Sequence, residues 1–155
     1  MSNEPSFDPQ AVHRYFSADC FNKAWDLIDK KDRTPDEDEQ MIRLNQASTW
    51  HWTQRSDCTP QNMAIGYWQT ARIYTLLKQL ENARRYGQLS LQEAQQEGVQ
   101  PFALGYAYEA LARAEAVAGN KPQMQAYLKQ AHQVAERMTD LEDKEQLLAD
   151  LDTIR

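Results

Sequence analysis

The sequence predicts an all-α protein: a right-handed stack of antiparallel helix pairs, with about seven helices. Three observations point to this fold class. Proline and cap-type residues mark helix starts at intervals along the chain, and no stretch shows the sustained period-two alternation of a strand. The chain also repeats itself at a fixed offset. Five glycines and six prolines are too few for the many turns of a β-sandwich or barrel.

The predicted helices begin at capping motifs. Thr34-Pro35-Asp36-Glu37 offers a cap threonine, a proline at the first helical position and a glutamate at the third, which together make a capping box. Thr139 and Glu142 form a second box, and Gly98 and Gly119 stand where helix ends are needed. Further starts are marked at Asp8-Pro9, Thr59-Pro60, Gln100-Pro101 and Asn120-Lys121-Pro122. These marks predict helices over residues 9–31, 35–56, 60–78, 80–97, 101–118, 121–138 and 140–153.

Apolar spacing supports these boundaries. Leu147, Leu151 and Ile154, for example, form a single stripe on the last helix. Ser17 and Asp19 are cap-type residues, so they favour a break in the first helix.

An internal repeat is the most informative feature. At an offset of 41, residues 60–98 fall on residues 101–139 and seven positions are identical, against roughly two expected from composition. The identical pairs are Pro60/Pro101, Tyr67/Tyr108, Ala71/Ala112, Arg72/Arg113, Tyr86/Tyr127, Gln92/Gln133 and Ala94/Ala135. Conservative pairs include Met63/Leu104, Gly66/Ala107, Leu76/Val117 and Ser90/Ala131. Small residues recur where two helices must approach closely, and large ones where neighbouring pairs must fill space.

These residues resemble the tetratricopeptide-repeat family. Tyr67, Ala71 and Tyr74 lie where that family places the large, small and aromatic residues of its first helix, and Ala83 falls on the small residue of the second. The next unit matches through Tyr108, Leu111, Ala112, Gly119, Leu128 and Ala131. The resemblance implies a superhelix of helix pairs in which the first helix of each pair lines a concave groove.

Two departures from the family pattern shape the predicted organisation of the single domain, residues 1–155. The usual period is 34, and the seven extra residues of each unit are almost two helical turns, so a longer second helix keeps its buried stripe in phase. Longer units of this kind occur in kinesin light chains. Residues 9–56 do not align at the offset and are expected to form a degenerate first helix pair. The second pair is 60–98, the third is 101–139, and 140–155 is a C-terminal capping helix. A four-helix bundle is the structural alternative.

Charge and composition restrict the partners. The formal net charge of −6 disfavours nucleic acid, because an acidic surface repels phosphate backbones. The start of the chain has no signal-peptide pattern, and no apolar run or basic amphipathic face predicts contact with a membrane. Two cysteines, Cys20 and Cys58, cannot make a disulfide framework and are expected to be reduced. These features predict a cytoplasmic protein.

Residue patterns for catalysis or metal binding are weak. His13, His51 and His132 are far apart in sequence and match no metal pattern, so no cofactor is expected. His51, in Trp50-His51-Trp52, is either a general base in an aromatic pocket or a half-buried histidine, and the second interpretation is favoured. Cys58 precedes a helix start that can lower its pKa, but an inert thiol is favoured. Arg84-Arg85 is interpreted as a solvated helix face.

The resemblance nominates a binding groove. It places Ile65, Trp68, Arg72 and Thr75 in the groove in one unit, and Tyr106, Glu109, Arg113 and Ala116 in the next. Trp68 and Tyr106 are then aromatic anchors, while Arg72 and Arg113 pair with an acidic peptide or a carboxylate. The lysine and asparagine residues of the chaperone-binding carboxylate clamp are absent. The alternative interpretation is that Trp68 packs against the first helix pair and the arginines bridge local carboxylates.

Two functions from different classes follow. The leading hypothesis is a non-enzymatic interaction module that receives a protein or peptide in its groove or edge, or that forms a homodimer through exposed aromatic residues such as Trp25, Trp50 and Trp52. The rival is a small-molecule-binding or catalytic protein with a pocket between the first helix pair and the repeats. That pocket would draw on His13, Trp50, His51, Cys58 and Trp68.

Overall fold

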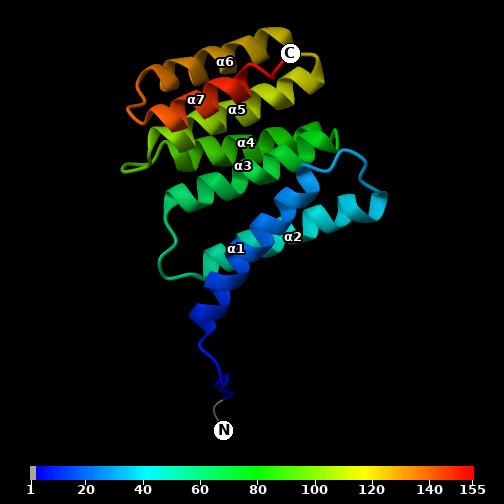
Figure 1. Cartoon of the computed structure of the whole chain (residues 1–155), viewed down its shortest axis with the longest axis vertical. Coiled ribbons are helices and arrows are strands. Elements are labelled where there is room, and N and C mark those ends of the chain that lie inside the picture. Colours follow the sequence, from blue (N-terminus) through cyan, green and yellow to red (C-terminus); the bar gives the residue numbers. More distant parts are fainter. Residues whose placement is uncertain (1–2) are drawn as a thin grey trace. The chain divides into compact units, whose positions relative to one another are not determined.

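The structure is a computed structural model that describes residues 3–155, and this part of the chain contains seven α-helices and no strand. In chain order the helices are α1 (Pro9–Ile28), α2 (Pro35–Gln54), α3 (Pro60–Leu76), α4 (Leu80–Ala94), α5 (Pro101–Ala118), α6 (Lys121–Glu136) and α7 (Leu141–Leu151). Figure 1 shows that α3 with α4, and α5 with α6, run antiparallel as neighbouring pairs. The predicted all-α fold class, with consecutive helices packed against each other, is confirmed.

The chain divides into two compact units, one ending at Thr59 and the other covering Pro60–Arg155. Each unit is described by itself. The expectation that residues 1–155 form a single domain stays a prediction.

The first unit is the helix pair α1–α2. The Asp8 side chain accepts a hydrogen bond from the Gln10 amide at the start of α1. Thr34 and Glu37 form the expected capping box of α2. The predicted break in α1 is wrong, because the helix continues through Ser17, whose hydroxyl donates to the Arg14 carbonyl. A serine that bonds back into its own helix satisfies its polar group without ending the helix.

The second unit is a stack in which each new helix packs on the pair before it. Helix α5 packs against both α3 and α4, and α7 packs in the same way against both α5 and α6. The starts of the first helices follow the sequence period: Pro60 for α3, Pro101 for α5 and Leu141 for α7. Helix α7 therefore occupies the place of the first helix of a further repeat.

Two tyrosine pairs confirm the repeat. The rings of Tyr67 and Tyr86 have centroids 6.0 Å apart and an interplanar angle of 34°. Their equivalents, Tyr108 and Tyr127, are 6.4 Å apart at the same angle of 34°. The two helix pairs thus join their members through the same aromatic contact at the same positions.

Several helix ends differ from the prediction in detail. Helix α7 is capped by Asp140, whose side chain accepts from the Asp143 amide, and not by the predicted Thr139. Gly119 ends α5 in the left-handed region, with φ of 73°, as expected of a C-cap glycine. Helix α4 ends earlier than predicted, at Ala94, and leaves Gly98 in the following loop.

One predicted surface residue takes part in an ion pair. Arg84 on α4 donates from Nε and Nη2 to the two carboxylate oxygens of Glu115 on α5, at 2.7 and 3.0 Å. Glu115 is buried, and its hydrogen bonds to Arg84 hold the pKa of its carboxyl below the ordinary value. Arg84 therefore links two helices of the stack while its side chain stays 42% exposed, and the neighbouring Arg85 is exposed as predicted.

Candidate functional site

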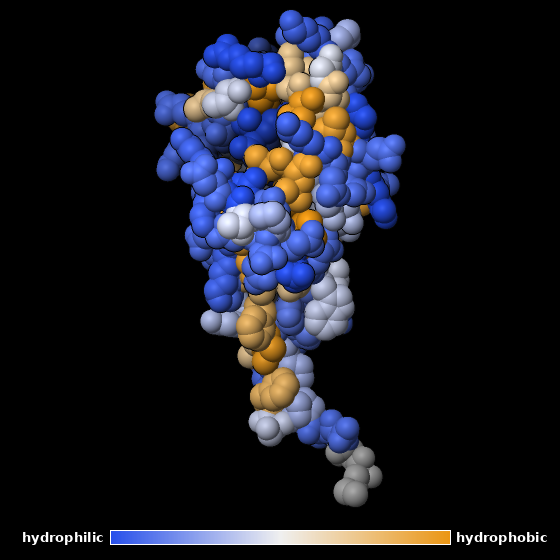
Figure 2. All heavy atoms as spheres, turned by 90° about the vertical axis from the view of Figure 1, so that its right-hand side faces the viewer, coloured by the Kyte–Doolittle hydropathy of each residue, from blue (hydrophilic) through white to orange (hydrophobic). Residues whose placement is uncertain are grey.

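A pocket of about 380 Å³ opens in the second unit, where α3 and α5 end. This volume lies within the range of small-ligand sites, about 300–1,000 Å³. Figure 2 faces the right-hand side of Figure 1, where α5 ends, and its upper part shows hydrophobic atoms in a band bordered by hydrophilic ones. The lining residues are Arg72, Thr75, Leu76, Lys78, Arg113, Ala116, Val117, Thr153, Ile154 and Arg155.

Two successive repeats line this pocket with residues at equivalent positions. Helix α3 contributes Arg72, Thr75 and Leu76, which lie on one face because they are three and four residues apart. Helix α5 contributes the residues at the same repeat positions, which are Arg113, Ala116 and Val117. The segment after α7, residues 153–155, completes the lining.

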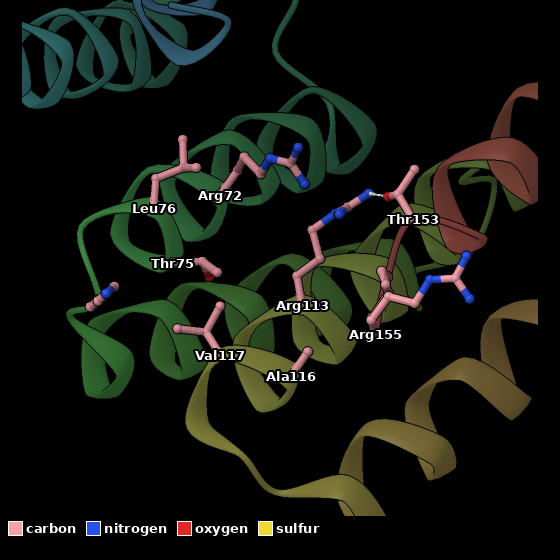
Figure 3. A pocket seen from close by; sticks show the side chains of 10 residues that line it. Arg72, Thr75, Leu76, Arg113, Ala116, Val117, Thr153 and Arg155 are labelled. Carbon is pink, nitrogen blue, oxygen red and sulfur yellow. Dashed lines mark hydrogen bonds between the residues drawn. The ribbon is translucent and has the colours of Figure 1, made fainter. Parts of the chain in front are cut away.

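The pocket has one cationic end and one apolar end. Figure 3 shows the guanidinium groups of Arg72 and Arg113 directed toward the same end, where Arg113 meets Thr153. Leu76 and Val117 lie at the other end, and their exposed fractions are 37% and 48%. An anionic group next to an aliphatic one would therefore match the two ends of this surface.

Glu109 fixes the two arginines from behind the pocket. It is only 2% exposed, accepts a hydrogen bond from Trp68 Nε1 at 2.8 Å, and pairs with both Arg72 and Arg113. Arg113 also donates from Nη2 to the Asp150 carbonyl at 3.0 Å and to Thr153 Oγ1 at 2.7 Å. The two guanidinium groups are thus held in place before any ligand arrives.

Tyr106 lies behind the same surface. It is 3% exposed, its ring packs at 5.0 Å from that of Trp68, and its hydroxyl donates to Asp150 Oδ2 at 2.5 Å. Burial, and then the hydrogen bond to Asp150, raise the pKa of Tyr106 well above its ordinary value. The placement of Tyr106 and Glu109 in an open groove is corrected by these exposures: α7 packs against α5, so both residues support the pocket and do not line it.

The five residues predicted to bind a partner therefore separate into two groups. Arg72 and Arg113 line the pocket, whereas Trp68, Tyr106 and Glu109 do not. Lining residues that the sequence interpretation missed are Leu76, Lys78, Val117, Thr153, Ile154 and Arg155. Leu76 and Val117 are a conservative pair of the repeat, so their shared position next to the arginines was a usable signal.

Unit one brings together residues that the sequence keeps far apart. Nδ1 of His13 on α1 and Nδ1 of His51 on α2 are 2.8 Å apart, so one nitrogen donates and the other accepts a hydrogen bond. Phe16 stacks on His51 with ring centroids 5.5 Å apart, and Trp50 meets both imidazoles edge-on. Burial, and then the neighbouring His13, lower the pKa of His51.

The residues of the rival site are divided between the two units. His13, Trp50 and His51 meet on the first unit, where the group that hydrogen-bonds His51 is another histidine. Cys58 lies near the end of that unit and Trp68 belongs to the second unit. Cys20 and Cys58 are both unbridged, and burial raises the pKa of the Cys20 thiol.

Neither a metal-binding cluster nor a membrane-spanning helix is found among the described residues. Within residues 3–155, no three His, Cys, Asp or Glu side chains are grouped so as to hold a metal ion. None of the helices described combines the length and the apolar character required to span a bilayer.

Comparison of the chain with protein-family models, curated proteins and solved structures finds no match.

Proposed function

We propose that the protein is a non-enzymatic interaction module, related in architecture to tetratricopeptide repeats, that holds a peptide segment of a protein partner in the pocket between α3 and α5. The observation that carries this proposal is the pocket itself. It is open, it is built from equivalent positions of two successive repeats, and two of its cationic side chains, Arg72 and Arg113, are paired with the buried Glu109. Preorganised side chains lose little conformational freedom when a ligand binds, which favours affinity.

The rest of the interpretation is part of the same proposal. The partner is a protein rather than nucleic acid, the protein acts without a cofactor, and it works in the cytoplasm. A homodimer is a further proposed state, for which the exposed rings of Tyr15 and Trp50, 62% and 56% exposed, are the available surface.

The rival proposal, a ligand-binding or catalytic pocket around Trp50, His51 and Trp68, has less support. A general base needs an acid or a nucleophile within hydrogen-bond reach, but His51 has His13 there. The Trp68 indole N–H is also bound to Glu109, behind the groove of the second unit.

Selection from a random peptide library displayed on phage, with the purified full chain immobilised, tests the interaction module. Val117→Asp places a charge at the apolar end of the pocket, whereas Leu141→Asp makes the same kind of change at an exposed residue that does not line the pocket. We expect the native protein and the Leu141→Asp variant to enrich related peptides, and Val117→Asp to lose them while keeping its melting temperature. A native protein that enriches no peptide, or a Val117→Asp variant that retains them all, would contradict the proposal.

A further inference from the structure

The charge of the pocket is opposite to that of the chain. The chain carries a formal net charge of −6, yet the lining contains four basic side chains, of Arg72, Lys78, Arg113 and Arg155, and no acidic one. Glu109 behind the lining offsets one of these charges. Within the described residues, Lys78 and Arg155 form no ion pair, and the Nη1 group of Arg113 donates no hydrogen bond. The pocket therefore offers unused positive charge and favours an anionic ligand.

Thr75 adds a second, independent observation. It is 6% exposed and lines the pocket, and its Oγ1 is buried without a hydrogen-bond partner among the described residues. Buried hydroxyl groups without a hydrogen-bond partner are few in folded proteins and call for an explanation. This oxygen is covered by its neighbours, so a ligand oxygen would supply the missing partner once the lining side chains around Thr75 have shifted. Figure 3 shows Thr75 between the two helices, close to both the arginine end and the Leu76–Val117 end.

The helix ends decide which anion fits. Helices α3, α5 and α7 all approach the pocket with their C-terminal ends, where the helix dipole places partial negative charge. This partial negative charge opposes a doubly charged phosphate more strongly than a singly charged carboxylate, and the two guanidinium groups can pair with the carboxylate. The lining also contains no aromatic ring on which a nucleobase could stack.

The apolar end defines the other half of the ligand. Leu76 and Val117 present aliphatic surface directly beside the cations, together with Ala116 and Ile154. Burial of an aliphatic side chain against them removes apolar surface from water and so favours binding. The ligand must therefore combine a carboxylate with a neighbouring aliphatic group and a backbone or carboxylate oxygen for Thr75.

We propose that the pocket binds a peptide segment of another protein in which an Asp or Glu stands next to a large aliphatic residue. The carboxylate lies at the Arg72–Arg113 end, the aliphatic side chain covers Leu76 and Val117, and the Thr75 hydroxyl donates to a peptide oxygen. This assignment rests on the proposed function, since it names the class of partner for the same groove.

The test is an NMR titration of the ¹⁵N-labelled full chain with a hexapeptide that is acetylated and amidated at its ends and carries Asp-Leu at its centre. Matched peptides carry Asn-Leu, which removes the charge, and Asp-Ser, which removes the aliphatic group. We expect the amide signals of Thr75, Arg113 and Val117 to shift with the Asp-Leu peptide, and each matched peptide to bind about tenfold more weakly.

Two variants locate the contacts on the protein. Thr75→Val removes the unpaired hydroxyl and nearly keeps the side-chain shape, so we expect weaker peptide binding and a melting temperature that is unchanged or higher. Lys78→Asn removes an exposed charge at a residue whose φ is 59°, a conformation that asparagine tolerates. The matched control is Lys129→Asn, at an exposed residue on α6 that does not line the pocket, and its binding should be unchanged.

The outcomes separate a failure of the acidic–aliphatic assignment from a failure of the interaction module. Equal binding of all three peptides at the pocket, or unchanged binding by Thr75→Val and Lys78→Asn, overturns the acidic–aliphatic assignment while the interaction module stands. Tighter binding of inorganic phosphate or of an oligothymidylate than of the peptide also overturns it. No shift with the Asp-Leu peptide, when the phage library enriches peptides of another composition, overturns the assignment alone. Failure of both experiments overturns the interaction module as well.

Discussion

Trp68 donates its indole N–H to Glu109, the residue that occupies the position of Trp68 itself in the next repeat, 41 residues further along the chain. The same relation continues one step further, since Arg72 pairs with Glu109 and Arg113 donates to the Asp150 carbonyl, each across 37 residues. Polar contacts thus form a ladder from α3 to α5 and from α5 to α7. This ladder holds the Arg72 and Arg113 side chains in place, and Glu109 takes part in the contacts of both.

Replacing Glu109 with glutamine tests this ladder. The amide keeps the size and an oxygen for Trp68, but it removes the charge that compensates two partly buried arginines. We expect a loss of about 1–3 kcal/mol in the free energy of unfolding, measured by urea denaturation, because two cations lose their counter-charge. The exposed Glu97→Gln provides the control and should change the free energy of unfolding by less than about 0.5 kcal/mol. Equal effects of the two substitutions would contradict the role of Glu109.

This geometry changes how the arginines can be used as probes. Alanine substitutions at Trp68 or Arg113 do not test partner binding alone. Both residues contact the buried Glu109, so their removal is expected to lower the melting temperature as well. Substitutions at Lys78 and Thr75 are expected to change peptide binding without lowering the melting temperature.

The repeat explains why the fold was predictable and the site only partly so. Pro60 with Pro101, and Tyr67 with Tyr108, are local and periodic signals, and the structure places them in equivalent environments. The burial of Tyr106 and Glu109 depends on where α7 packs, and the sequence predicted residues 140–155 only as a C-terminal capping helix. The repeat resemblance predicts which residues face the groove in each repeat. It does not predict that a further helix, α7, covers some of these residues.

The histidine pair shows a different limit. His13 and His51 are 38 residues apart and share no motif, because their contact follows from how α1 and α2 cross. Only the register of two packed helices brings the nitrogens together, and side-chain spacing within one helix carries no information about that register.

Gly87 tests the close packing of the stack. A Cβ at this position would lie 2.6 Å from Cδ2 and 3.0 Å from Cγ of Leu111, which is 1% exposed. Alanine improves helix propensity by about 1 kcal/mol, but overpacking of a filled core costs about 1–3 kcal/mol. We expect Gly87→Ala to lower the melting temperature, and Leu111→Val to restore part of the loss in the double variant. A melting temperature that rises in Gly87→Ala would show that α4 and α5 are not held as close as described.

Leu147 tests whether α7 is a structural part of the repeat stack. Its side chain is fully buried and lies where a Cβ on Gly105 would come within 2.5 Å of its Cδ2. We expect Leu147→Ala to reduce the free energy of unfolding by about 2–5 kcal/mol and to raise hydrogen exchange in α5 as well as in α7. The matched change Leu141→Ala, at a residue 71% exposed on the same helix, should have little effect. Faster exchange confined to α7 would instead describe an appendage that the stack does not need.

The stability of the first unit should depend on pH through His51. Its pKa is lowered in the folded chain by burial and by His13, so the folded state resists a proton that the unfolded chain accepts near pH 6.5. The neutral imidazole therefore contributes its full stability above that pH, and the contribution is lost as the pH falls toward the lowered value. The charged groups of the same two helix ends form salt bridges, Arg14 with Asp8 at the start of α1 and Arg55 with Asp57 after α2.

Hydrogen exchange between pH 7.5 and 5.5, corrected for the intrinsic pH dependence of exchange, measures this effect on the full chain. We expect protection of α1 and α2 to fall on acidification in the native protein, and to change less in His51→Phe, which cannot take up the proton. The exposed His132→Gln on α6 should behave like the native protein. If His51→Phe loses protection on acidification as steeply as the native chain does, the titrating group lies elsewhere and the facing imidazoles are only a packing contact.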